Sequence, residues 1–201
     1  AASDVYKRQF YYYTGTFDGQ GHTLTLNWDA GTAHWKSPFY TVENATIKNL
    51  RVKGQIKSKG KGHTGLIQNA YGTVTVSGCV SDVKITNGDK NDTYCAAGMV
   101  LSAHPESKIT FNDCIVAGDI NGTVDNSQQN MGGFVSAQAD NATCTFNNCL
   151  YTGTNNAKGG YAFAPKPTLN NCYYLNACGV AQGTKITEEQ LKNGEVAYLL
   201  Q

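Results

Sequence analysis

The sequence predicts an all-β fold, a right-handed, single-stranded parallel β-helix (a β-solenoid) with a short C-terminal capping helix. Three observations support this prediction: the composition, an internal repeat of strand-like segments, and a polar corner at a constant place in each repeat. Of the 201 residues, 22 are glycine, 12 tyrosine and only 4 proline, and charged residues make up 15%. This composition, with its long Thr and Asn runs, is typical of an all-β protein rather than of a helical or disordered one.

One strand-like segment in each repeat has alternating apolar residues. Five such segments occur, at residues 45–50, 74–79, 109–114, 144–149 and 167–172. Their starts lie 29, 35, 35 and 23 residues apart. In the second segment Val74 and Val76 flank Thr75, which is the period of a strand with one buried face. Residues 23–26 supply an earlier, less regular unit.

Two small polar residues follow each of these strands, and the apolar positions then change parity. In the third segment Asn112 and Asp113 separate Phe111 from Cys114. A one-residue shift in a period-two pattern would turn the buried face outward unless the chain bends at that point. Asn, Asp and Gly tolerate left-handed backbone and form local hydrogen bonds. These pairs therefore mark a corner, beyond which another strand begins.

A glycine-led strand precedes each unit. Gly65, Gly98 and Gly133 are each followed by two apolar residues, at offsets of 33 and 35 residues. Each coil should then hold a short strand, a variable loop, a second strand, the corner and a third strand. Such a coil cannot bury its own apolar face, so successive coils must stack to do so.

The chain is expected to have three parts. Residues 1–9 resemble translated adaptor sequence, as in metagenomic fragments, and are taken as a non-native leader. Residues 10–179 carry the β-helix repeats, and residues 180–201 form a tail. In this tail Thr187 opens a capping box, which predicts a helix over residues 188–200. Four of its residues are expected to dock on the open end of the last coil: Leu191, Ala197, Tyr198 and Leu200.

Two stretches of the chain resemble bacterial right-handed β-helix surface proteins. Residues 13–24 look like the opening coil of such proteins, and residues 39–50 are similar to the coil that follows it. The Gly-led strands resemble the repeats of the GLUG-motif group, with Gln68, Leu101 and Ser136 at the position where that motif ends in glycine. The resemblance covers residues 14–179. It implies an extracellular, adhesin-like surface protein without known chemistry.

Cysteine recurs at one position of the repeat, directly after the corner. This position forms a row that begins with a leucine: Leu50, Cys79, Cys114, Cys149 and Cys172. We expect its members to stack about 4.8 Å apart inside the core, where cysteine behaves as a small apolar residue. A zinc site needs thiolates that converge on one point, which a linear row does not provide. No metal or other cofactor is expected, and Cys95 and Cys178, outside the row, are either free thiols or disulfide-bonded.

Two rows of outward residues are the candidate interaction surfaces. One is a threonine row on the repeated strands: Thr46, Thr75, Thr110, Thr145 and Thr168. Such a face can order water or bind ice or sugar, although threonine is also simply a stable exposed strand residue. The other is an apolar row after the corner, which follows Arg51: Val80, Ile115, Leu150 and Tyr173. A row of this kind implies a cover, either a loop, a neighbouring domain, the C-terminal helix or a partner protein.

Little in the sequence indicates catalysis. Lyases and glycoside hydrolases built on β-helices need clustered carboxylates, yet Asp82 aligns with Lys53, Ala117 and Thr152. The four histidines share no spacing and no nucleophile motif.

A net charge of +1 argues against nucleic-acid binding, and no apolar run reaches the roughly 18–20 residues of a membrane helix. The lysine-rich residues 53–63 are interpreted as a solvated loop.

We therefore expect a non-enzymatic module of an extracellular or cell-surface protein, either adhesin-like or a rigid spacer, with flanking domains in the same full-length chain. Its expected partner is a glycan or an extracellular protein. The alternative is a non-catalytic fragment of a carbohydrate-active β-helix enzyme, with the catalytic coils upstream. Three loops are the remaining candidate surfaces: residues 57–63, 87–93 and 121–130.

Overall fold

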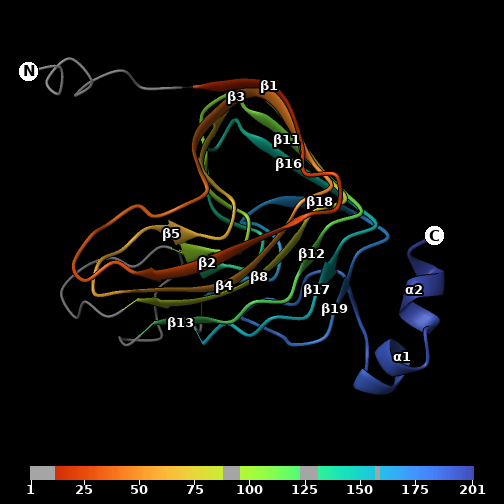
Figure 1. The fold of residues 1–201 in the computed structure, drawn as a ribbon. Helices are drawn as coiled ribbons and strands as arrows, with labels where there is room; N and C mark the ends of the chain where they lie inside the picture. The colour runs from red at the N-terminus through yellow and green to blue at the C-terminus, as the bar shows by residue number, and fades with distance from the viewer. Residues whose placement is uncertain (1–11, 88–95, 123–130, 157–158) are drawn as a thin grey trace, which may run out of the picture.

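The chain is all-β over the residues described, with parallel strands and two short helices near the C-terminus (Figure 1). The computed structural model describes four stretches: residues 12–87, 96–122, 131–156 and 159–201. The expected leader, residues 1–9, lies outside them, and so do Cys95 and most of the expected loops 87–93 and 121–130.

The largest sheet has two arms, and one strand runs through both. The first half of β3 (Phe39–Lys48) pairs with β6 (Ile67–Tyr71), and its second half pairs with β7 (Thr73–Ser77). Gly72, with a left-handed φ of 61°, separates β6 from β7 and so bends the chain between the arms. The other strands of the sheet add to these in parallel: β1 (Tyr13–Asp18), β10 (Val100–Ala103), β11 (Lys108–Asn112), β15 (Val135–Gln138), β16 (Thr143–Asn147) and β18 (Pro167–Asn170).

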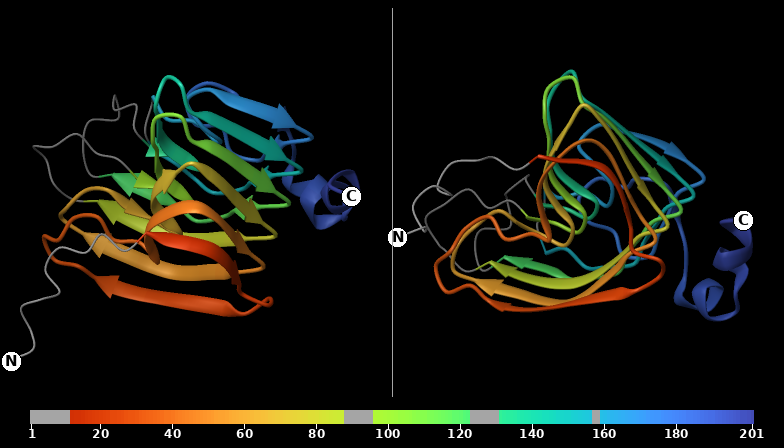
Figure 2. Two further views of the ribbon diagram at one scale, coloured as in Figure 1. Left: turned by 90° about the horizontal axis from the view of Figure 1, so that it is seen from above. Right: turned by 45° about the horizontal axis from the view of Figure 1, so that its top comes forward.

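Two further parallel sheets complete the fold. The second sheet consists of β2 (Thr23–Asp29), β4 (Arg51–Ser58), β8 (Val80–Asn87), β12 (Ile115–Val116), β13 (Ile120–Gly122), β17 (Leu150–Tyr151), β19 (Tyr173–Tyr174) and β20 (Thr184–Lys185). The third consists of β5 (His63–Thr64), β9 (Ala96–Ala97) and β14 (Met131–Gly132). One turn of the chain contributes β5 to β8, and the next contributes β9 to β13. Figure 2 shows these turns stacked on one another.

The repeated segments of the sequence are confirmed as partners in the sheet. Ile109 pairs with Val74 on one side and with Cys144 on the other, and Cys144 pairs in turn with Pro167. Within β11 the residues alternate between buried and half-buried, as the period of two requires. The sequence repeat is therefore the stacking repeat of the structure.

The polar corner is made by residues in the left-handed conformation. Five register-related residues have φ between 52° and 59°: Asn49, Gly78, Asp113, Asn148 and Asn171. Their side chains also bond from turn to turn, since the Asn148 amide donates to Asp113 at 3.1 Å and the Asn171 amide donates to Asn148 at 2.9 Å. This bend is what allows the residue after the corner to point inward again.

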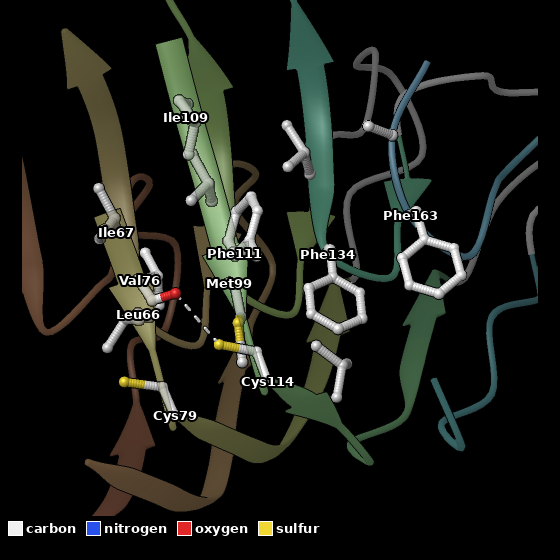
Figure 3. Close-up of a cluster of buried hydrophobic side chains, with 14 of the residues drawn as sticks. Leu66, Ile67, Val76, Cys79, Met99, Ile109, Phe111, Cys114, Phe134 and Phe163 are labelled. Atoms are coloured by element: carbon white, nitrogen blue, oxygen red, sulfur yellow. Dashed lines mark hydrogen bonds between the residues drawn. The ribbon is translucent and has the colours of Figure 1, made fainter. Parts of the chain in front are cut away.

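The interior is filled by stacked side chains, as Figure 3 shows. The residues that follow the three leading glycines form one buried row, which Phe163 continues in the next turn: Leu66, Met99, Phe134 and Phe163. Phe134 stacks on Phe163 with ring centroids 5.1 Å apart. It also meets Phe111 and Phe146 edge-on, at 5.7 and 5.4 Å. This aromatic group ties the first sheet to the glycine-led strands.

The leading glycines of these strands leave no space for a side chain. A Cβ on Gly98 would lie 2.2 Å from the carbonyl oxygen of Gly133 and 2.5 Å from Cγ1 of Val116. The backbone of the next turn cannot move away without breaking its own ladder. We therefore expect Gly98→Ala to lower the free energy of unfolding by about 2–3 kcal/mol, measured by urea denaturation under reducing conditions.

Gly21→Ala is the matched control, because Gly21 has a φ of 76° but a Cβ added there would have nothing within 4 Å. Its cost should be about 1 kcal/mol, from backbone conformation alone. If both variants lose the same stability, steric exclusion at Gly98 is not the cause.

The C-terminal segment differs from the single predicted helix. It forms α1 (Glu188–Lys192) and α2 (Glu195–Leu199), because Gly194 takes a left-handed φ of 82° between them. The predicted capping box is present, with the Thr187 hydroxyl accepting from the backbone N–H of Gln190 at 3.2 Å.

The two helices lie on the side of the second sheet (Figure 2) and not on the open end of the last coil, so they provide one of the covers expected for the outer apolar row. Val196 and Ile186 form a buried cluster with Leu150, apart from the main core. Of the four residues expected to dock on the last coil, Leu191 and Leu200 join this side cluster, whereas Ala197 and Tyr198 are exposed. The outer apolar row offers the helices a hydrophobic surface, and burying it drives their placement.

Candidate functional site

The cysteine row is part of the core. All five of its positions are buried, beginning with Leu50, and each cysteine of the row places its Sγ within 3.6 Å of a backbone carbonyl of the preceding turn. Neighbouring Cys144 is also buried, which raises the pKa of its thiol to about 12. A thiol with such a pKa is a poor nucleophile at neutral pH.

Cys178 is likewise buried and carries a free thiol. Burial raises its pKa to about 11, partly offset by its contacts with Tyr151 and Asn155. Among the described residues, no three His, Cys, Asp or Glu side chains gather in a way that could hold a metal ion.

The threonine row lies in direct register on the outside of the first sheet. Thr75 pairs with Thr46 and with Thr110, and Thr145 continues the row to Thr168. These side chains are half-buried or exposed. The row starts one turn earlier than predicted, because Thr16 pairs with Thr46; the irregular first coil hid that member in the sequence.

The apolar row after the corner also lies in register, from Arg51 through Val80, Ile115 and Leu150 to Tyr173. The C-terminal helices cover part of it: Leu150 is only 5% exposed, and Ile115 and Tyr173 pack against the same cluster. Leu150 is therefore a packing residue rather than an accessible interaction site. At the other end of the row, Arg51 pairs with Asp82 at 3.0 Å.

A cavity of about 540 Å³ lies at the end of β2 and in the loop that follows it. It is lined by residues 27–30, 33 and 35–37, which we call the tryptophan cup. Both tryptophans of the chain, Trp28 and Trp35, line it. Trp28 packs partly against the core, whereas Trp35 is 41% exposed. Pockets of this size with aromatic walls and a few polar groups are the usual form of small-ligand sites.

The loop of the cup is held by the next turn of the chain. Trp35 donates its backbone N–H to the carbonyl of Lys61 at 2.9 Å, and Lys59 donates to Gly31 at 2.6 Å. The Ser58 hydroxyl lies 2.8 Å from the carbonyl of Ala33. The position of the Trp35 ring therefore depends on contacts between turns.

Trp35 has an unusual backbone conformation, with a φ of 58°. Bulky residues rarely take this left-handed conformation, and such strain persists only where the surrounding contacts hold it. The ring covers Gly62, where an added Cβ would lie 2.0 Å from Cε3 of Trp35. A glycine is therefore needed beneath the ring.

Three polar side chains of the cup are oriented by hydrogen bonds. Oδ1 of Asn27 accepts from the Gln55 amide at 3.0 Å, which leaves the Asn27 amide nitrogen as a donor. Oδ1 of Asp29 accepts from the backbone of Gly31 at 3.2 Å. The Ser37 hydroxyl donates to the carbonyl of Phe39 at 2.9 Å.

A buried histidine, His63, bonds to the backbone of the loop that lines the cup. His63 is fully buried, and its Nδ1 accepts from the backbone N–H of Lys36 at 3.2 Å, whereas Nε2 has no hydrogen-bond partner among the described residues. Loss of hydration lowers the pKa of His63 to about 4; the backbone of Gly60 opposes this shift, and the nearby His34 and Lys36 add to it. The imidazole is therefore neutral at pH 7.

No pattern in the sequence had predicted the cup. The signal that was available is the occurrence of both tryptophans within eight positions of a polar segment, residues 28–35. Searches of family models, of curated proteins and of solved structures each returned no match to the chain. In the part of the chain that the structure describes, no helix has the length and apolar character to cross a membrane.

Proposed function

We propose that the chain is a right-handed parallel β-helix with GLUG-like repeats, which serves as a non-enzymatic, adhesin-like module of an extracellular or cell-surface protein and binds a glycan. The turns stack in parallel register and the residues inside them pack as a core. The cysteines that are described belong to that interior. Ligand binding is therefore assigned to the outer surface and the loops.

The observation that carries glycan binding is the exposure of aromatic rings on the first turns. Tyr12, Trp35 and Tyr40 are each between 41% and 52% exposed. The flat apolar faces of such rings suit the C–H face of a sugar ring, and their polar neighbours can bond to its hydroxyls.

An array of glycans and extracellular-matrix proteins tests this proposal. We expect the protein to bind one or more glycans, without turnover of any polysaccharide offered. A variant with Thr75, Thr110 and Thr145 replaced by Ser tests the threonine row, and unchanged binding would remove that row as the site. Absence of all binding would favour a rigid spacer, and release of reducing ends would favour a carbohydrate-active enzyme; either result would overturn the proposal.

A further inference from the structure

We propose that the tryptophan cup is the glycan-binding site and that it takes an anionic pyranose, a sugar ring that carries a carboxylate or sulfate. This inference rests on the proposed function and adds to it a site and a ligand class. The cup combines a cavity of suitable size, two indole rings, oriented polar groups and a lysine-rich surrounding.

The aromatic part of the argument starts from the backbone of Trp35. A tryptophan at a φ of 58°, seated over a glycine and tied to the next turn, is held against its conformational preference. Packing on Gly62 accounts for one face of the ring, but Trp35 remains 41% exposed. Display of the ring to a ligand accounts for both the strain and the exposure.

The polar groups of the cup match the hydroxyls of a sugar. The Asn27 amide nitrogen is a donor, and Oδ2 of Asp29 is an acceptor, while the opposite atom of each side chain is engaged within the protein. Asn27 and Asp29 alternate with Trp28 along β2, so their polar groups lie on the outer face of the strand, at the edge of the cup, whereas Trp28 turns toward the core. They would meet the hydroxyl edge of a pyranose whose apolar face lies on Trp35.

The charge of the surrounding segment selects the class of sugar. Lys36 lines the cup. Lys57 is the register partner of Asp29 on the neighbouring strand. Lys59 and Lys61 lie in the segment whose backbone bonds to the loop. Among the described residues, Lys36, Lys57 and Lys59 thus accompany Asp29, the carboxylate that lines the cup, so the charge of these residues favours an anionic ligand. The sequence interpretation of residues 53–63 as a solvated loop is wrong in part, because residues 53–58 belong to β4 and His63 is buried in β5.

The test uses the intrinsic tryptophan fluorescence of the protein, because both of its tryptophans line the cup. Polygalacturonate, dextran sulfate and neutral dextran are titrated separately. We expect an emission change with one or both anionic polymers and none with dextran, and the affinity should fall as NaCl is raised. The two anionic polymers distinguish a carboxylated from a sulfated ligand.

Substitutions then locate the site, with calorimetry as the readout. Trp35→Ala should weaken binding at least about tenfold, Trp35→Phe should retain part of it, and Lys36→Gln with Lys57→Gln should reduce both the affinity and its salt dependence. Tyr198→Ala is the matched control, since it removes an aromatic ring that is 76% exposed on α2. Thermal melts show whether each variant is folded. If Trp35→Ala does not fold, Trp35→Phe still tests the role of the ring.

The outcomes separate this inference from the proposed function. If the protein binds a glycan and Trp35→Ala and Trp35→Phe bind it equally well, the cup is not the site, although glycan binding stands. If dextran binds as tightly as the anionic polymers, the charge argument is wrong. If no glycan binds and the protein instead forms a dimer that Trp35→Ala abolishes, the cup is an interface between copies and both proposals fail.

Discussion

Replacing Phe134 with alanine is expected to lower the free energy of unfolding by about 3–5 kcal/mol. The side chain is fully buried and contacts three other phenylalanine rings, Phe146 of its own turn and Phe111 and Phe163 of the two neighbouring turns. Its removal leaves a cavity whose walls belong to hydrogen-bonded ladders, so they cannot collapse to fill it. The loss therefore combines the lost transfer free energy of the ring with the lost contacts around it.

Urea denaturation followed by far-UV circular dichroism, under reducing conditions, measures this effect. Phe134→Leu is the informative companion, because it keeps an apolar side chain and should lose clearly less stability than alanine. Tyr198→Ala, at an exposed ring, should stay within about 0.5 kcal/mol of the wild type. A loss below about 1 kcal/mol in Phe134→Ala would mean that the aromatic row is not tightly packed.

Acidification is expected to destabilise the protein through His63, by about 3 kcal/mol in total. The pKa of this imidazole is about 4 in the folded protein, against 6.5 for an ordinary histidine. Above pH 6.5 the group is neutral in both states and has no effect. Between pH 6.5 and 4 only the unfolded chain takes up the proton, so stability falls by about 1.4 kcal/mol per pH unit. Below pH 4 both states are protonated and the loss levels off.

The measurement compares the free energy of unfolding of the wild type and His63→Asn from pH 7.5 to 3.5. Asparagine retains an acceptor near the position of Nδ1, toward the backbone N–H of Lys36, but it does not titrate. The variant should lack the part of the acid sensitivity that lies between pH 6.5 and 4, whereas carboxylates affect both proteins alike. His22→Asn, at an exposed histidine, should keep the wild-type profile. Parallel profiles for wild type and His63→Asn would contradict the prediction.

The register of the turns could be predicted from the sequence because it depends on a local pattern, the alternation of apolar residues and its change of parity at the corner. Alternation in Val74–Val76 and Ile109–Phe111 places one face inward, and the parity change demands a bend that Asp113 and Asn148 supply with their left-handed backbone. The interior position of the cysteine row follows from the same pattern. Each of these features depends on residues within one short segment and its copies.

The placement of the C-terminal helices could be predicted only as one of several alternatives, because the sequence allowed them to cover the outer apolar row or to dock on the open end of the last coil. The capping box at Thr187 is local and was predicted, but the surface that receives the helices depends on which apolar row remains uncovered once the turns have stacked. Leu150 belongs to that row, and Val196 reaches it from 46 residues later in the chain. Hydrophobic burial has no direction, so a sequence pattern indicates an apolar face but not its partner.

The repeat, the corner and the inward face of each strand can thus be determined from the sequence alone, because they follow from strand geometry, in which side chains alternate with a period of two. The tryptophan cup and the burial of His63 arise only when the turns have stacked. Trp35 keeps its strained backbone because, one turn later, the carbonyl of Lys61 accepts its backbone N–H and Gly62 leaves space for its ring. A neutral His63 requires the surrounding turns to exclude water. Such features are created by contacts between turns, which no pattern within a single turn encodes.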